Sequence, residues 1–275
     1  MPQNIDEVEF TIFDTETTGL DPDSGDRIVE IAAVRIKGRE KIAFFESLVN
    51  PGREISEAAF AVNHIDAGML KGAPRPQEVM PKFLDFIRNS CLCSYNAGFD
   101  LDFLNNELRL LGRKGLEEGI VVIDILKMAK RLLPGLERYA LWFVAEGLGI
   151  REQQQHRAFS DVELTLSVFD KLKRILGAKG IEDFANFSQL FGINSGFLED
   201  VNNHRLALIQ EAINLGVGLK IKYLSSSSAE VTERQVIPKE IRQENKKNYL
   251  VGFCSLRQDE RTFRVDNILQ LEMDR

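Results

Sequence analysis

The sequence predicts an α/β fold in which a mixed sheet of five strands is flanked by helices and is followed by a small β domain. Within residues 1–178, short apolar runs with strand character alternate with segments whose apolar residues recur every three to four positions. Beyond Leu176 this alternation stops. The 275 residues also exceed the ~250 at which a single core usually stops growing, so two domains are expected.

In the first domain, three strands come first and are expected to form an antiparallel meander, with a turn-rich stretch at 19–25 between the first two. Afterwards helices and short buried strands alternate. The expected strands are 8–13, 28–36, 42–49, 91–95 and 121–125. The expected helices are one carrying Val79, Phe83, Phe86 and Ile87, one running from Phe99 to Leu111, and three at 126–133, 139–148 and 162–176.

The glycine-bearing stretch 179–202 is expected to connect the two domains, which places the second at 203–275. This second domain should begin with a helix at 205–215. Alternating strands are then expected at 219–224, 233–237, 249–255 and 261–271, with the serine run 225–228 as a hairpin tip. Such a series of short strands predicts a small barrel or sandwich.

Composition excludes several classes of protein. With 44% apolar and 28% charged residues, the chain is neither disordered nor of low complexity. Its apolar runs fall far short of the ~20 residues of a membrane span, and residues 1–9 carry three acids and no base, unlike a targeting segment. We therefore expect a cytoplasmic protein without membrane contact, whose three cysteines (Cys91, Cys93 and Cys254) are reduced and buried.

Charge is unevenly distributed along the chain. The net charge is -7, yet residues 205–264 hold eleven Lys and Arg against seven Asp and Glu. This basic stretch is compatible with a polyanionic ligand, and an ordinary solvated surface is the alternative.

Acidic residues occur at three places where strands or helices begin or end. Asp14 and Glu16 alternate along the first strand and should share one face of the sheet. Asp100 follows the strand at 91–95, where it would serve either a site or a helix N-cap. Ser160 and Glu163 have the spacing of a capping box at the start of a helix, which would place Asp161 in the first turn of that helix. His156 would precede the helix in an exposed loop.

Taken together, these motifs resemble those of the DEDD exonucleases, in the histidine subclass that includes the epsilon proofreading subunit of bacterial DNA polymerase III. The matching segments are 13–20, 96–104 and 156–165. The tyrosine subclass would have Tyr four residues before the last Asp, where this chain has Arg157. Tyr95 departs from the family, which commonly has His there. The resemblance implies a ribonuclease H-like fold over about residues 7–176.

The resemblance also implies roles for these residues. Two divalent cations about 4 Å apart, Mg²⁺ or Mn²⁺, would activate water and stabilise the leaving oxygen. Asp14, Glu16 and Asp161 would hold the first ion, Asp14 and Asp100 the second, and His156 would accept the proton of the water. The terminal nucleotides would contact Thr17, Gly19, Leu20, Asn63, His64, Ile65, Asn96 and Phe99. For Leu20, Ile65 and Phe99, core packing is the alternative.

A second resemblance covers the C-terminal part. Ile221-Lys222-Tyr223, Arg234 to Pro238, Tyr249 to Gly252 and Arg261 to Arg264 are similar in type and order to the WYL domain, a small Sm- or SH3-like β-barrel of bacterial regulators. Asn248 replaces the Trp of the eponymous motif. The resemblance implies a groove for single-stranded nucleic acid or a nucleotide-like ligand lined by Tyr223, Arg234, Tyr249, Arg257 and Arg264, with a plain solvated face as the alternative.

From these observations we expect a metal-dependent 3′-to-5′ exonuclease that releases nucleoside 5′-monophosphates from single-stranded DNA. A 3′-to-5′ exoribonuclease with the same site is the nearest alternative. In a third interpretation, the chain is an interaction protein that senses a regulatory ligand or docks on a DNA polymerase.

Overall fold

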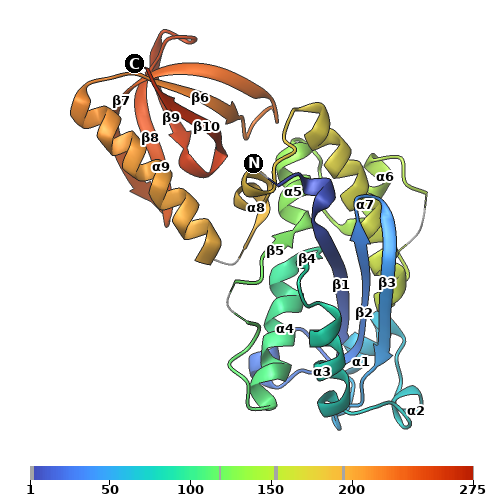
Figure 1. The fold of residues 1–275 in the computed structure, drawn as a ribbon. Coiled ribbons are helices and arrows are strands. Elements are labelled where there is room, and N and C mark those ends of the chain that lie inside the picture. The colour runs from blue at the N-terminus through green and yellow to red at the C-terminus, as the bar shows by residue number, and fades with distance from the viewer. Residues whose placement is uncertain (1–2, 118, 152–153, 194–195, 275) are drawn as a thin grey trace.

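The computed structural model describes residues 3–117, 119–151, 154–193 and 196–274, with side chains left out for 196–200. Two five-stranded sheets dominate it, one in each part of the chain (Figure 1). None of the helices in these ranges is long and apolar enough to cross a membrane. All three cysteines are buried free thiols, as expected.

The first sheet is mixed and has the strand order β3-β2-β1-β4-β5. β1 pairs antiparallel with β2 and parallel with β4, so β1 occupies the centre. Its strands are β1 (Glu9–Thr17), β2 (Ile28–Lys37), β3 (Glu40–Leu48), β4 (Cys91–Ser94) and β5 (Val122–Asp124). The predicted mixed sheet of five strands is therefore confirmed.

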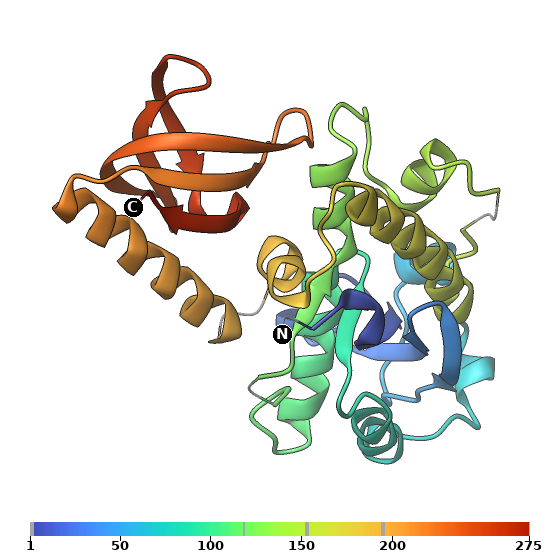
Figure 2. The same cartoon turned by 45° about the horizontal axis from the view of Figure 1, so that its top comes forward.

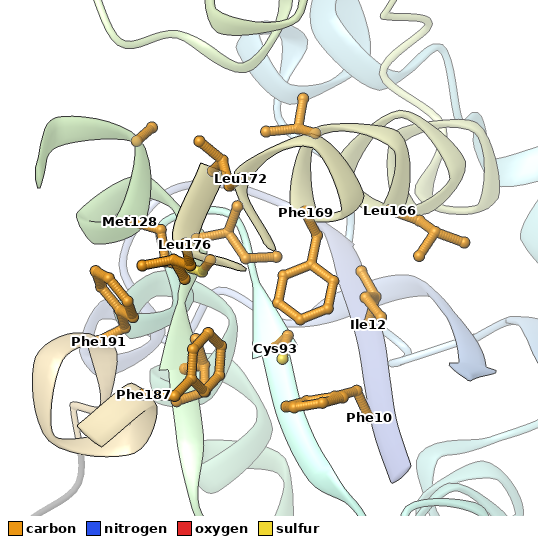
Figure 3. Packing of buried hydrophobic residues seen from close by; sticks show 14 of the residues in the cluster. Phe10, Ile12, Cys93, Met128, Leu166, Phe169, Leu172, Leu176, Phe187 and Phe191 are labelled. Carbon is orange, nitrogen blue, oxygen red and sulfur yellow. The ribbon is translucent and has the colours of Figure 1, made fainter. Parts of the chain in front are cut away.

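Helices cover both faces of this sheet, because alternate residues of β1 and β2 are apolar on both sides. On one face, Phe10 and Ile12 pack against α5 (Ile125–Leu132), α6 (Leu141–Gly147), α7 (Ala158–Ala178) and α8 (Phe184–Phe191). Figure 3 shows Phe10, Phe169 and Phe187 gathered there. On the other face, Phe13 packs against α3 (Pro76–Phe86) and α4 (Ala97–Leu110).

The stretch 179–202, for which we expected a connection, holds α8, whose Phe187 and Phe191 are fully buried in the first-face core. The start of the chain lies beside it, since Ile5 N donates to Glu182 O at 2.8 Å and Phe184 N to Gln3 O at 2.9 Å. Where the chain divides into domains stays a prediction.

The second sheet is antiparallel, in the order β10-β6-β7-β8-β9, and α9 (Gly196–Leu215) packs on it (Figure 2). Its strands are β6 (Leu219–Leu224), β7 (Val231–Glu244), β8 (Lys247–Cys254), β9 (Asp259–Arg264) and β10 (Ile268–Met273). In the described part of the chain no ladder joins β9 to β10, so the sheet is open there, and barrel closure stays a prediction.

Several elements differ from those expected. β1 continues to Thr17, four residues beyond the expected end at Phe13, so Asp14 and Glu16 lie inside the strand. The expected strand at 261–271 is two strands, separated by the short 3₁₀ turn Val265–Asn267. Helices α1 (Glu57–Asn63) and α2 (Ala67–Leu70) were not predicted, because each is too short to display a helical repeat.

Candidate active site

Three carboxylates meet at one end of the central strand. Asp14 and Glu16 follow Ile12 on the face of β1 that α7 covers, and Asp161 lies in the first turn of α7. Ligand oxygens of the three residues all lie within 4.8 Å of one another. The period of two along β1 and the packing of α7 on the sheet thus bring together residues 147 positions apart in sequence.

The acidic cluster is electrostatically strained in the absence of a cation. Burial raises the pKa of Asp14 well above its usual value, and the charges of Asp100, Glu16 and Asp161 raise it further. Burial, followed by the charges of Asp161 and Glu30, raises the pKa of Glu16 to about 8. Crowded carboxylates in a partly buried site are the arrangement that a hard divalent cation stabilises. These residues therefore fit a divalent metal site.

Asp100 lies on α4, which packs on the other face of the sheet, and its charge acts on Asp14 of the cluster. Its Oδ1 accepts from Thr15 N at 2.9 Å and Thr15 Oγ1 at 2.7 Å, while its Oδ2 accepts from Ser94 Oγ at 2.5 Å. Burial raises its pKa to about 6, and these hydrogen bonds oppose the rise. The N-cap alternative for Asp100 is wrong, because Asn96 occupies that position and Asp100 follows in the first turn of α4.

The capping-box interpretation of Ser160 and Glu163 is also wrong. The N-cap of α7 is Arg157, and Glu163 pairs instead with Lys41 of β3. Asp161 does lie in the first turn, where its Oδ2 accepts from Gln154 Nε2 at 3.0 Å and its Oδ1 from Gln155 N at 3.2 Å. Residues 152 and 153 of this loop lie outside the described ranges.

His156 is exposed on the loop that leads into α7, with a left-handed φ of 52°. It lines a cavity of about 720 Å³ together with Gln154, Trp142, Glu146 and Ile150. Because Gln154 also donates to Asp161, this cavity adjoins the acidic cluster. His156 is thus connected to the acidic cluster through the neighbouring loop residue Gln154, and its role in the site stays a prediction.

Two residues that the sequence interpretation did not assign to the site hold this loop. Glu30 lies opposite Glu16 in the β1–β2 register and is buried, and its carboxylate pairs with Arg157 and accepts from Ala158 N at 2.9 Å. A usable signal for Glu30 was present, since a single acid interrupts the apolar run of β2. Arg157 gave no such signal.

The end of β1 and the loop after it carry three of the predicted substrate contacts. The Thr17 hydroxyl donates to Gly19 O at 2.5 Å, and Leu20 is 83% exposed, which excludes core packing for this side chain. A Cβ on Gly19 would lie 2.2 Å from the carboxylate of Asp26, so only glycine allows this close approach.

The segment at 63–65 supports Thr17 from the side. Buried Asn63 donates from Nδ2 to Thr17 O at 3.2 Å and accepts from Ile65 N at 3.0 Å. His64 is exposed, with a left-handed φ of 56°. Ile65 is fully buried beside Val29 and Leu70, as its packing alternative expects.

The remaining predicted contacts of the first domain lie at the start of α4. Asn96 is exposed with a left-handed φ of 64°, and half-buried Phe99 contacts Phe103 at a ring distance of 4.9 Å.

Three of the five residues predicted to line a C-terminal groove lie together, since Arg264 N donates to the Tyr223 hydroxyl at 3.4 Å and Tyr249 faces Arg264 across β8 and β9. Tyr223 packs on Phe263 inside the second core, and Arg234 donates to Thr232. Arg264 pairs with Asp266. Arg257 is exposed in the turn between β8 and β9. The groove itself stays a prediction. Arg264 also belongs to a second cluster of cations, described below.

Comparison with known proteins identifies the family. A family model described as Exonuclease matches residues 11–169, more than half of the chain. The chain belongs to the exonuclease family. A second model, the WYL domain, matches residues 204–273 of this exonuclease. Both resemblances seen in the sequence are confirmed, and so is the prediction that the protein is an exonuclease enzyme.

Curated relatives contain the exonuclease region as a small part. The chain is 36% identical over 184 residues to the DNA polymerase III PolC-type of Caldanaerobacter subterraneus subsp. tengcongensis, covering 67% of this chain and 13% of that protein. It is 38% identical over 184 residues to a DNA polymerase III subunit epsilon-like protein of Rhodobacter capsulatus, covering 66% of this chain and 26% of that protein. The chain thus spans about a quarter or less of these relatives.

Solved structures share the fold. The nuclease domain of 3'hExo, a DEDDh family member, has a TM-score of 0.56 at 18% identity and covers 66% of this chain and 97% of its own. Exonuclease I has a TM-score of 0.56 at 14% identity, and the match covers 94% of this chain and 63% of the Exonuclease I chain. The expected ribonuclease H-like exonuclease fold is confirmed.

Proposed function

We propose that the protein is a divalent-metal-dependent 3′-to-5′ exonuclease that releases nucleoside 5′-monophosphates from single-stranded DNA. The observation that carries the proposal is the meeting of Asp14, Glu16 and Asp161 within 4.8 Å at the end of a central strand in a chain of the exonuclease family.

In this proposal, Asp14, Glu16 and Asp161 hold one Mg²⁺ or Mn²⁺, and Asp14 and Asp100 hold a second. When bound, the two ions supply a more acidic water and stabilise the charge on the leaving oxygen. Asp100 Oδ1 already accepts two hydrogen bonds from Thr15, which fixes the carboxylate relative to β1. The protein therefore contributes ligands whose positions are set before substrate arrives.

His156 accepts the proton of the attacking water in this proposal. Its exposed position at the rim of the cavity allows access to solvent, which is where the proton must finally go. Exposed Leu20, beside the site on the loop after β1, contacts the last bases of the strand.

DNA is favoured over RNA as the substrate because the curated relatives carry the names of DNA polymerase III proteins. On the same ground, association with a DNA polymerase is part of the proposal. The C-terminal sheet with α9 would be a closed Sm-like barrel that binds nucleic acid or a regulatory ligand.

The test is hydrolysis of 3′- and 5′-end-labelled single-stranded DNA and RNA of equal sequence, with Mg²⁺, Mn²⁺ or EDTA. Wild-type protein should shorten DNA from the 3′ end, and Asp161→Asn should lose the activity. Asp66→Asn, a change at an exposed acid that caps α2, is the matched control. Faster hydrolysis of RNA would establish the exoribonuclease instead, and equal activity of Asp161→Asn would refute the acidic site.

A further inference from the structure

A cavity of about 300 Å³ lies where α5 of the exonuclease domain meets the C-terminal sheet. Its polar lining residues are Asp124, Lys127, Lys130, Arg131, Ser226 and Arg264. None of them belongs to the acidic site. The cavity is therefore a second candidate site, built by two parts of the chain.

Cations predominate around this cavity. Lys127, Lys130 and Arg131 share one face of α5, because residues three and four apart on a helix are neighbours, and Arg264 approaches from the end of β9. Two carboxylates oppose these four cations. Asp124 caps α5 through Leu126 N, and Asp266 accepts from both arginines, with Arg131 Nη2 at 3.0 Å from Oδ2. The site thus keeps a net positive charge.

Arg131 has a donor left over. The residue is only 8% exposed, and its Nη1 has no hydrogen-bond partner among the described residues. A buried guanidinium donor without a partner is costly, and such groups in native proteins usually have an acceptor. Asp266 is already engaged by Nη2 and by Arg264, so no described residue supplies the missing acceptor, and a bound anion would.

Lys127 is a second, half-buried cation at this cavity, and no carboxylate pairs with it among the described residues. Its ammonium donates to the backbone oxygen of Gly192 at 2.9 Å, and burial and then the charge of Arg131 lower its pKa to about 8. The nearby charges therefore do not compensate one another. An anion between α5 and Arg264 would stabilise all of them.

We propose that this cavity binds a small phosphate-bearing anion, either inorganic phosphate or the phosphate of a nucleotide. Arginine side chains match the oxygens of phosphate with paired donors, and Lys130 and the Ser226 hydroxyl add further donors. The volume is at the lower end for small-ligand sites. Among the residues that the structure describes, no aromatic one lines the cavity, so the phosphate and not a base is the recognised group. Because the lining comes from both domains, the bound anion fixes the C-terminal sheet against α5.

The test uses metal-free, full-length protein in EDTA, at constant ionic strength set with NaCl. Inorganic phosphate and then dAMP are titrated by isothermal calorimetry, and thermal unfolding is followed at the same concentrations. Wild-type protein should bind one phosphate saturably and unfold at a higher temperature as phosphate increases. Equal affinity for phosphate and dAMP identifies phosphate alone as the ligand group, and tighter binding of dAMP identifies a nucleotide.

Lys130→Gln is the deciding variant, because Lys130 is exposed and its removal leaves the ion pairs of the junction intact. It should weaken phosphate binding roughly tenfold or more, and Arg131→Gln should abolish it. Lys82→Gln, at an exposed position of α3, is the matched control and should bind like wild type.

Three results would overturn the proposal: no saturable binding of either anion, equal affinities in Lys130→Gln and Lys82→Gln, or saturable binding of a single-stranded oligonucleotide alone. Since the readout is binding in EDTA, failure here leaves the proposed nuclease untouched. Loss of nuclease activity in Asp161→Asn likewise leaves this site untouched.

Discussion

Arg157 and Glu30 form a two-point ion pair at the edge of the acidic cluster, with Nη2 2.6 Å from Oε1 and Nε 3.1 Å from Oε2. Glu30 is fixed in β2 opposite Glu16, and Arg157 directly follows His156 and begins α7. The pair therefore fastens the segment that carries His156 and Asp161 to the strand beside the one that carries Asp14 and Glu16.

Replacing Arg157 should damage both stability and catalysis. Arg157→Ala leaves the buried Glu30 carboxylate without its charged partner, which should cost roughly 1–3 kcal/mol of unfolding free energy in urea denaturation. Single-stranded DNA hydrolysis should fall at least tenfold because the histidine loop loses its tether. The control, Arg88→Ala, breaks an exposed pair with Asp85 and should cost under about 0.5 kcal/mol. Equal losses in the two variants would contradict the tether.

The stability of the metal-free protein should fall as pH rises. The folded pKa of Glu16 is about 8 against an ordinary 4.5, so the folded state binds more protons than the unfolded state between these values, and unfolding free energy decreases with pH across that window. Glu16→Gln should flatten this dependence, and saturating Mg²⁺ should offset it. The measurement is urea denaturation in EDTA from pH 5 to 9, with Glu57→Gln as an exposed control. A Glu16→Gln profile parallel to wild type would argue against a buried, crowded carboxylate.

His156→Ala should lower the hydrolysis rate by roughly 100-fold while Mn²⁺ binding by calorimetry persists, because the ligands of the metal lie elsewhere. His204→Ala, an exposed histidine of α9, is the matched control. A near-normal hydrolysis rate in His156→Ala would assign the proton transfer to another group.

Nucleic-acid binding by the C-terminal sheet is best tested at its cavity of about 640 Å³, which Lys220, Lys222 and Arg234 line. Arg264 is unsuitable for charge reversal because it holds Asp266 at the domain junction. Lys220→Gln with Lys222→Gln should reduce the salt slope of long single-strand binding by roughly 0.7 for each phosphate that the variant no longer neutralises. Lys246→Gln with Lys247→Gln, at the exposed β7–β8 turn, is the control pair. Identical slopes in both double variants would remove this surface from strand binding.

A fragment ending at residue 178 should fail to fold, whereas a fragment ending at residue 193 should fold. The shorter fragment lacks Phe187 and Phe191, both fully buried against the sheet, and removing one such side chain costs roughly 3–5 kcal/mol. Circular dichroism and thermal unfolding of both fragments provide the measurement. A cooperative transition in the 1–178 fragment would show that α8 is dispensable.

Much of the fold was predictable because its signals are local. The strands of the first sheet and α3 to α7 follow apolar periodicities that survive in a single sequence. Helix α8 was missed because its apolar residues lie between Gly180 and Gly192. Its stability comes from contacts of Phe187 with Phe10, far away in the chain, and with Phe169 of α7.

The site was predictable to a different degree. The acids were found because their motifs match a family, but the residues that hold them were not. Glu30 contacts Arg157 from 127 positions away, and Arg131 meets Asp266 across 135. Pairings at such separations depend on tertiary packing, which leaves no period in the sequence.

The pairing of the first residues with the stretch just before α8 has a consequence for architecture. The nuclease unit begins beside the helix that ends it, since Gln3 and Ile5 bond to Phe184 and Glu182 at the start of α8. Its two ends are therefore separated by little more than the length of α8, about 12 Å. A domain of this kind can be inserted into a surface loop of a larger protein with little distortion of that loop, because the two ends of the inserted domain are close together. In the PolC-type polymerase of Caldanaerobacter, the matching segment is only 13% of the protein. Chain ends that lie close together would allow a nuclease domain of this kind to be inserted into larger proteins of very different length.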